Sequence, residues 1–147
     1  ESYVAAVLRK NLDSRQYRVY VQAKGKYLFE LPQKQFALRP DLVIEDLNSG
    51  EKTVLDTKWK LLSPQWHNYG ISQADMYQMY AYQKEYAAKQ TVLLYPDCEA
   101  IADQKIPFCY SSSSGSLVRV QTLHLDSPIA MVEAVRELLD IASQPSK

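Results

Sequence analysis

The sequence has little of several features that would each identify a class of protein. Its 147 residues include only two cysteines, Cys98 and Cys109, too few for a disulfide framework or a zinc cage. We therefore interpret both as buried or incidental thiols in a reducing compartment, the cytoplasm. No apolar run approaches the ~18 residues that span a membrane, and no signal-peptide pattern is present. The sequence thus predicts no membrane partner.

The chain also lacks net charge, because its 17 basic and 17 acidic residues cancel. Any binding of nucleic acid must therefore come from a local patch. A hydrophobic content of 46% and a charged content of 23% are typical of a soluble globular domain. The length predicts a single domain over residues 1–147 with a sizeable core. Because the chain begins with Glu1 rather than Met, we expect it to be the C-terminal part of a longer protein.

The clearest local pattern is a β-hairpin around a tight turn at Asn48-Ser49-Gly50. Counting outward from the turn places Asp41 opposite Asp56, and alternation puts Lys58 on the same face as Asp56. Opposed carboxylates at a Cβ separation of about 5 Å destabilise a sheet. A cation between them is therefore expected, and Mg²⁺ is the natural candidate because it prefers oxygen ligands. The alternative is a surface hairpin whose charges are simply solvated.

The remaining periodicities predict an α/β fold, a mixed β-sheet flanked by helices. The expected helices cover residues 1–12, 72–88 and a segment starting at Pro128, and the expected strands cover 17–23, 27–31, 36–45, 52–62, 91–95, 106–110 and 117–125. Residues 111–116 are predicted to be a flexible connector. Side chains expected in the core include Val4, Val7, Leu8, Leu12, Leu55, Trp59, Ile129, Val132, Val135, Leu138 and Leu139.

The helix over residues 72–88 has the strongest start signal in the chain. Ser72 followed by Asp75 is typical of a capping box, and Ile71 with Met76 fits a hydrophobic staple. Its expected buried stripe consists of Met76, Met79, Tyr80 and Tyr86. Gln78 and Tyr82 lie four residues apart and share one face. Such a pair is more often a structural hydrogen-bonding pair than part of a functional site.

Two further side chains have alternative interpretations. Glu1 lies in the first turn of a helix, where a carboxylate favours the helix dipole, but it could also contribute to the metal site. His67 lies in the loop before the second helix and could contact substrate or metal, although a loop histidine more often does neither. His124, at the end of a strand, is interpreted as structural.

Three motifs together resemble the PD-(D/E)xK nuclease superfamily in its RecB-like form. They are Pro40-Asp41, Asp56-Thr57-Lys58 and Gln78-x-x-x-Tyr82, in this order after an N-terminal helix. The fuller strings 39–43, 55–60 and 72–82 resemble the nuclease domain of the McrC family, the cleavage subunits of McrBC modification-dependent restriction systems. The resemblance covers roughly residues 1–95.

This resemblance implies a restriction-endonuclease-like fold and a Mg²⁺-dependent DNA endonuclease, with Mn²⁺ as a substitute metal. It implies that Asp41, Asp56 and the Thr57 carbonyl bind the metal, and that Lys58 orients the attacking water or stabilises developing charge. Gln78 would position the site, Tyr82 would support it or touch DNA, and Lys60 is a candidate phosphate contact.

The resemblance further implies an AAA+ GTPase partner of the McrB type, which reads the methylated cytosine. Further phosphate contacts are expected from Lys24, Lys26 or Arg39. Two alternatives stay open. One is a free-standing RecB-like repair nuclease, and the other is a non-catalytic nuclease-fold module that docks an AAA+ motor.

Overall fold

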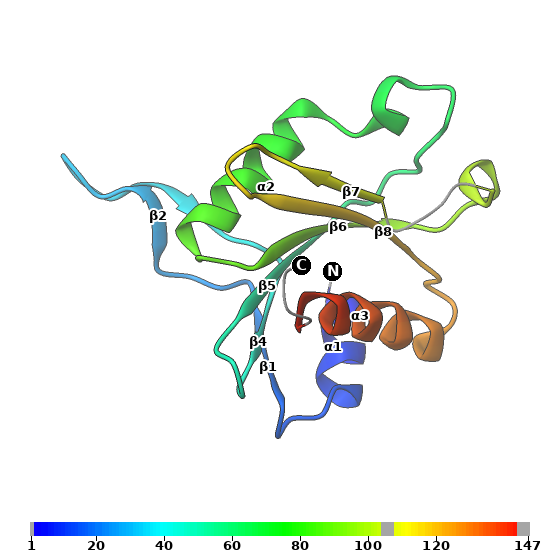
Figure 1. Ribbon diagram of the computed structural model, residues 1–147, viewed down its shortest axis with the longest axis horizontal. Helices are drawn as coiled ribbons and strands as arrows, with labels where there is room; N and C mark the ends of the chain where they lie inside the picture. The colour runs from blue at the N-terminus through cyan, green and yellow to red at the C-terminus, as the bar shows by residue number, and fades with distance from the viewer. Residues whose placement is uncertain (1, 104–107, 144–147) are drawn as a thin grey trace.

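The computed structural model describes residues 2–103 and 108–143, and its centre is a six-stranded mixed sheet (Figure 1). The strand order is β1-β4-β5-β6-β8-β7. The strands are β1 (Tyr17–Val21), β4 (Leu42–Asp46), β5 (Lys52–Thr57), β6 (Gln90–Pro96), β7 (Phe108–Ser111) and β8 (Leu117–Leu123). Strands β5, β6 and β8 are parallel, whereas β1, β4 and β7 pair antiparallel with their neighbours. This mixed sheet confirms the predicted α/β class.

Three helices form the outer layers of this sheet. Helices α1 (Ser2–Asn11) and α3 (Pro128–Ser143) cover one face, and α2 (Gln73–Glu85) covers the other (Figure 1). Two short 3₁₀ helices, η1 (His67–Gly70) and η2 (Glu99–Ile101), lie in the connections around α2 and β6. Strand β6 is buried on both faces from Gln90 to Tyr95, as is typical of a central strand in a sheet with both faces covered.

The hairpin register is confirmed. Leu42 pairs with Leu55 and Val43 with Val54, so that Asp41 lies opposite Asp56 one residue beyond the ladder. Val43 and Val54 pack on the α2 side of the sheet, whereas Leu42 and Leu55 pack on the side of α1 and α3. The carboxylates therefore belong to the face that α2 covers.

The predicted single strand over 36–45 is wrong. Residues 35–38 form a separate strand, β3 (Gln35–Leu38), which pairs with β2 (Lys26–Phe29) in a two-stranded sheet of its own. Pro40 separates β3 from β4, since it has no N–H to donate to a ladder. We call residues 22–40, which contain β2 and β3, the arm.

Three aromatic or aliphatic side chains expected in the core are exposed. Trp59 is 55% exposed because β5 ends at Thr57, so the alternation that would have buried it does not continue. Tyr80 is 40% exposed, and Tyr82 is buried in its place on α2. Ile129 lies in the first turn of α3 and is 75% exposed. The other expected core residues of α1 and α3 are buried.

The predicted helix starts are confirmed by their hydrogen bonds. The Asp75 N–H donates to Ser72 Oγ at 3.0 Å, and the Ala130 N–H donates to Ser127 Oγ at 3.2 Å. Helix α2 ends at Glu85, three residues earlier than expected. Residues 111–116 form the turn of the β7–β8 hairpin rather than a free connector, with the Ser112 N–H donating to the Ser116 carbonyl.

The remaining expectations concern the thiols and the ends of segments. Cys98 and Cys109 are both free, and Cys109 is exposed. The predicted strand over 106–110 begins outside the described residues, and its described part belongs to β7. Within residues 2–103 and 108–143, no helix is both long enough and apolar enough to cross a membrane.

Candidate active site

The two carboxylates of the hairpin meet where β4 begins and β5 ends. The Asp41 N–H donates to Asp56 Oδ1 at 3.4 Å, so the residues are in direct contact. The Thr57 N–H and Oγ1 donate to Asp41 Oδ2 at 2.8 and 2.7 Å, which fixes the orientation of that carboxylate. The turn-derived register thus places Asp41, Asp56 and Thr57 together, as the sequence predicts.

Asp56 is an unusually buried acid, with 5% of its surface exposed. Burial raises its pKa from an ordinary value of 3.8 to about 6, and the negative charge of Asp41 acts in the same direction. The hydrogen bond and positive charge of Lys58 oppose this rise. The site therefore holds a carboxylate whose charge is only partly compensated by the protein.

Lys58 connects the sheet to α2. Its Nζ lies 2.7 Å from Asp56 Oδ2 and 3.3 Å from Asp75 Oδ1, and it donates to Gln78 Oε1 at 3.1 Å. Burial alone would lower the pKa of Lys58, but the interactions with Asp56 and Asp75 outweigh it and raise the pKa. Lys58 is thus a protonated amine held between two acids.

Gln78 has a defined orientation because each end of its amide has a partner. Oε1 accepts from Lys58, and Nε2 donates to the Tyr82 hydroxyl at 2.9 Å. Tyr82 is 3% exposed, and burial together with the charges of Asp56 and Asp41 raises its pKa. This burial favours the supporting role of Tyr82 over the expected contact with DNA, which stays a prediction.

Asp75 is a member of this network that the sequence motifs did not indicate. It was interpreted only as part of the helix cap, yet its carboxylate pairs with Lys58. The available signal was its spacing, since Asp75, Gln78 and Tyr82 recur at i, i+3 and i+7 on one helix face. Tyr95 was also missed. Its buried hydroxyl has no hydrogen-bond partner among the described residues, and burial and the charges of Asp75 and Asp56 raise its pKa.

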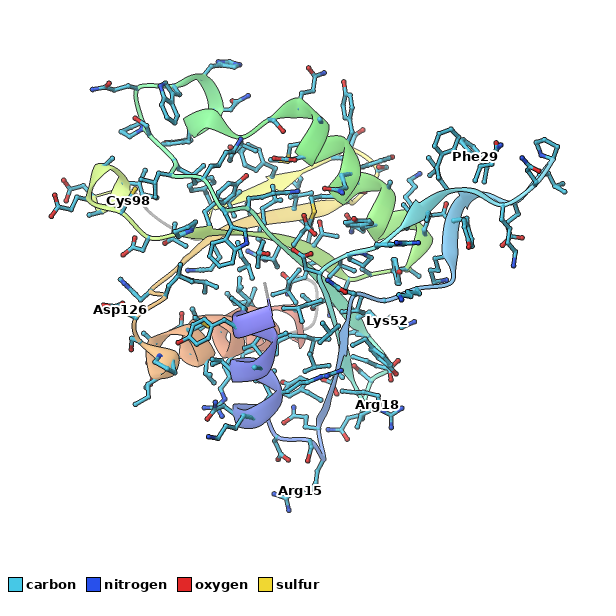
Figure 2. The ribbon with its side chains drawn as sticks, turned by 180° about the vertical axis from the view of Figure 1, so that it is seen from behind. Arg15, Arg18, Phe29, Lys52, Cys98 and Asp126 are labelled. Carbon is cyan, nitrogen blue, oxygen red and sulfur yellow. The ribbon has the colours of Figure 1, made fainter. Side chains whose placement is uncertain are left out.

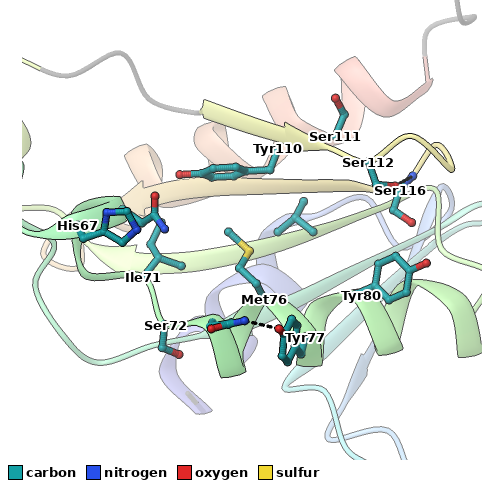
Figure 3. Close-up of a pocket in the computed structure, with 13 residues that line it drawn as sticks. His67, Ile71, Ser72, Met76, Tyr77, Tyr80, Tyr110, Ser111, Ser112 and Ser116 are labelled. Atoms are coloured by element: carbon teal, nitrogen blue, oxygen red, sulfur yellow. Dashed lines mark hydrogen bonds between the residues drawn. The ribbon is translucent and has the colours of Figure 1, made fainter.

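The other sequence candidates lie apart from this network. Lys60 is exposed beyond the end of β5, and its Nζ donates to the Gly70 carbonyl at 2.7 Å. His67 lines a groove of about 660 Å³ between α2 and the β7–β8 hairpin, together with Tyr77 and Tyr110 (Figure 3). Glu1 lies outside the described residues.

The oxygen atoms at this site fit a magnesium ion better than a zinc ion. Across the described parts of the chain, no group of three or more His, Cys, Asp or Glu side chains could hold a metal. The candidate donors are the carboxylates of Asp41 and Asp56 and the carbonyl of Thr57, the residue whose N–H meets Asp41. Mg²⁺ commonly uses one or two carboxylates and retains several waters, whereas Zn²⁺ takes nitrogen and sulfur ligands.

Comparisons with known proteins bear on the fold and on the family of the chain. The chain matches one chain of a solved structure described as a refined half-complex from the tetradecameric assembly of Thermococcus gammatolerans McrB AAA+ hexamers with bound McrC. The TM-score is 0.63 at 17% identity, and the match covers 90% of this chain but 30% of that chain. This likeness supports the restriction-endonuclease-like fold. A search of curated proteins found no match.

The sequence itself gives the family. Residues 1–96 match the family model described as McrBC 5-methylcytosine restriction system component. The matched range contains all three motifs, from Asp41 to Tyr82, and the resemblance to the McrC family is confirmed. The chain belongs to the family of McrBC 5-methylcytosine restriction system components.

Proposed function

We propose that this chain is a Mg²⁺-dependent DNA endonuclease domain, the McrC-like cleavage subunit of a modification-dependent restriction system. One observation carries the proposal: Asp41, Asp56 and Lys58 converge at one end of the α2-covered face of the sheet. Family membership supports the biological setting, since the family acts in 5-methylcytosine restriction.

The roles of the residues follow from their contacts. Asp41, Asp56 and the Thr57 carbonyl would hold Mg²⁺, which polarises the scissile phosphate and lowers the pKa of a bound water. Thr57 orients Asp41 through two hydrogen bonds. Lys58, protonated and held by Asp75 and Gln78, is placed to orient the water or to stabilise the negative charge that develops on the phosphate.

Partner dependence is part of the proposal. The net charge of zero gives the chain little long-range attraction for a polyanion. The solved relative was described with McrB AAA+ hexamers, and this chain corresponds to under a third of the matched chain. We therefore infer that an McrB-like GTPase holds the DNA and that cleavage requires this partner, GTP and methylated DNA.

A plasmid-cleavage comparison tests this function. The full-length subunit is combined with its GTPase and Mg²⁺, with and without GTP, on methylated and unmethylated plasmid, beside the 147-residue chain alone. We expect cleavage only in the complete mixture with methylated plasmid. Vigorous cutting of unmethylated DNA by the isolated chain would instead favour the free-standing RecB-like nuclease.

One observation favours the non-catalytic alternative: the acids already have protein partners, so the network could serve only to hold α2 on the sheet. A metal titration separates the two functions. If the site binds Mg²⁺, the melting temperature rises with Mg²⁺ or Mn²⁺ by mass action, and Asp41→Ala or Asp56→Ala abolishes the rise. A wild-type melting temperature that stays constant through millimolar metal would support the non-catalytic module.

A further inference from the structure

The arm leaves the body of the protein directly at the proposed metal site. It is inserted between β1 and β4, and its two ends meet where the Gln22 N–H donates to the Asp41 carbonyl at 2.9 Å. From there it projects away from the sheet in both views, with β2 at one extreme of Figure 1 and Phe29 at one extreme of Figure 2. The base of the arm therefore lies beside Asp41, and whatever the rest of the arm contacts is held within the length of the arm from that residue.

The arm is anchored at its base and free of the core beyond it. Leu38 is buried and Ala23 is partly buried in the core beneath α2, and Lys26 Nζ lies 5.4 Å from the centre of the Tyr86 ring. Farther out, the side chains of Phe29, Leu31 and Phe36 are 54%, 85% and 67% exposed. Phe29 and Phe36 contact each other edge to face, with ring centres 6.1 Å apart. The tip thus presents apolar surface that the fold does not use.

The arm is also the positive part of a neutral chain. Residues 22–40 contain four basic side chains, Lys24, Lys26, Lys34 and Arg39, and one acidic side chain, Glu30. The arm therefore carries a net charge of +3, and the other residues, with thirteen basic and sixteen acidic side chains, carry −3. All four basic residues are exposed. A local basic patch is what a protein without net charge needs in order to bind a polyanion.

We propose that the arm is a DNA-binding β-ribbon that holds duplex DNA beside the metal site. Lys24, Lys34 and Arg39 contact phosphates, and the apolar tip around Leu31 enters a groove. This inference rests on the proposed nuclease function and names the element that binds its substrate. The major groove admits a two-stranded ribbon, and apolar side chains enter base steps in many groove-binding proteins.

The dimensions of the arm agree with such a role. Leu31 lies nine positions after Gln22, which at about 3.3 Å per residue gives a reach of at most roughly 30 Å. One turn of duplex DNA is about 34 Å long. The tip would therefore contact DNA within about one turn of the bond at Asp41. A protein partner for the tip is the competing occupant, but an apolar protein surface would not explain the net charge of +3.

Fluorescence anisotropy with a duplex of about 30 base pairs, roughly three helical turns, tests the arm. The binding is measured with a chelator present, so that no DNA is cut, between about 50 and 200 mM salt. We expect Lys24→Glu/Lys34→Glu to weaken binding about tenfold or more and to reduce the salt slope by about 2, one per lost phosphate contact. Leu31→Ser should weaken binding while leaving the salt slope unchanged.

The control is Lys10→Glu/Arg15→Glu, which changes the net charge equally but on exposed residues of α1 and the loop that follows it. It should bind DNA within about twofold of the wild type. Equal weakening by both double variants, or wild-type binding by Lys24→Glu/Lys34→Glu, would overturn the proposal. So would an arm variant that binds DNA normally but no longer associates with the GTPase, which would assign the tip to a protein partner.

This test can fail independently of the proposed function. Wild-type cleavage in the complete mixture, combined with unaltered DNA binding by the arm variants, would remove the arm proposal and leave the nuclease intact. Loss of DNA binding by the arm variants in a protein that never cuts and shows no response to Mg²⁺ would leave a DNA-binding arm on a non-catalytic module.

Discussion

The two faces of the central sheet have different chemistry. The hydrophobic core beneath α1 and α3 consists of aliphatic side chains and Met131. The polar side chains buried on that side are paired, since Gln90 Nε2 donates to the Leu138 carbonyl and to Thr53 Oγ1. The core beneath α2 contains three buried tyrosines, Tyr82, Tyr86 and Tyr95, and the hydroxyls of the last two have no partner among the described residues. The same face carries the charged network of Asp56, Lys58 and Asp75 at one end. The first face pairs the few polar groups that it buries, whereas the second buries charged groups and two hydroxyls without a partner among the described residues. Burying such groups costs folding free energy.

A single strand contributes to both faces. On β5, Leu55 is completely buried under α1 and α3, and Asp56, the next residue, points to the α2 side. Alternation along a strand therefore lets a rigid, well-packed element carry the carboxylate that we propose as a metal ligand. Removing a packed side chain should lower the free energy of unfolding, whereas removing a side chain of the network should mainly lower cleavage per folded molecule. Four predictions test this difference.

The largest effect is expected from the apolar face. Leu8→Ala removes a side chain that is 0% exposed between α1 and the sheet, and its cavity should lower the free energy of unfolding by about 4 kcal/mol. Urea denaturation measures this change. Leu61→Ala, at a position that is 56% exposed, is the matched control and should cost less than about 0.5 kcal/mol. Similar losses for both variants would mean that this face does not form the stabilising core.

Next in size is the effect of Lys58→Ala on chemistry. Cleavage per folded molecule in the assembled system should fall at least about a hundredfold, or roughly 2.7 kcal/mol, because the positive charge beside the reacting phosphate is lost. The rise in melting temperature with Mg²⁺ should persist, since an ammonium group is not a metal ligand. Lys89→Ala, which breaks an ion pair with Glu51 away from the site, is the control. Wild-type cleavage by Lys58→Ala would rule out its assigned role.

The site was predictable from the sequence where a local feature fixes the geometry. The turn at Asn48-Ser49-Gly50 sets the hairpin register, and the register brings Asp41 to Asp56. The capping box at Ser72 sets where α2 starts, and hence which side chains face Lys58. Both signals lie within a few residues of the element that they determine.

The remaining features depend on tertiary context. The alternation of β5 predicts a buried Trp59, but the strand ends two residues earlier and the side chain is exposed. The strands of the arm contain exposed phenylalanines, although phenylalanine is also common in core strands. No local pattern distinguishes a strand of the main sheet from a strand in a projecting ribbon. Asp75 was recognisable as a cap but not as a partner of Lys58, since that contact joins residues 17 apart.

The third prediction concerns the cost of burying Asp56. Because its pKa is about 6 in the folded protein and 3.8 ordinarily, the unfolded chain loses this proton first as the pH rises. Stability in metal-free buffer should therefore fall between about pH 4 and 6, and Asp56→Asn should remove that fall. Relative to the wild type, the free energy of unfolding of Asp56→Asn should increase by on the order of 2 kcal/mol between pH 4 and 7.

Urea titrations at several pH values measure this difference. Mg²⁺ should reduce it, since a bound cation favours the charged carboxylate. Asp13→Asn is the control. Its pH-dependent difference in stability from the wild type should have the opposite sign, because hydrogen bonds from Arg15 lower the pKa of Asp13. A pH-independent difference between wild type and Asp56→Asn would contradict the assigned burial effect.

The smallest effect separates two glutamines on α2. Gln78 orients Lys58 and is oriented by Tyr82, whereas Gln83 Oε1 accepts from the Leu117 N–H at 3.0 Å and joins α2 to β8. Gln78→Ala should lower the rate of cleavage per folded molecule about tenfold, equivalent to roughly 1.4 kcal/mol in the activation free energy. The free energy of unfolding should change little. Gln83→Ala should lower the free energy of unfolding by about 1 kcal/mol, because the Leu117 N–H loses its partner, and should leave cleavage per folded molecule unchanged. If both variants lost stability and neither lost cleavage, Gln78 would be a structural residue like Gln83. It would then not belong to the proposed active site.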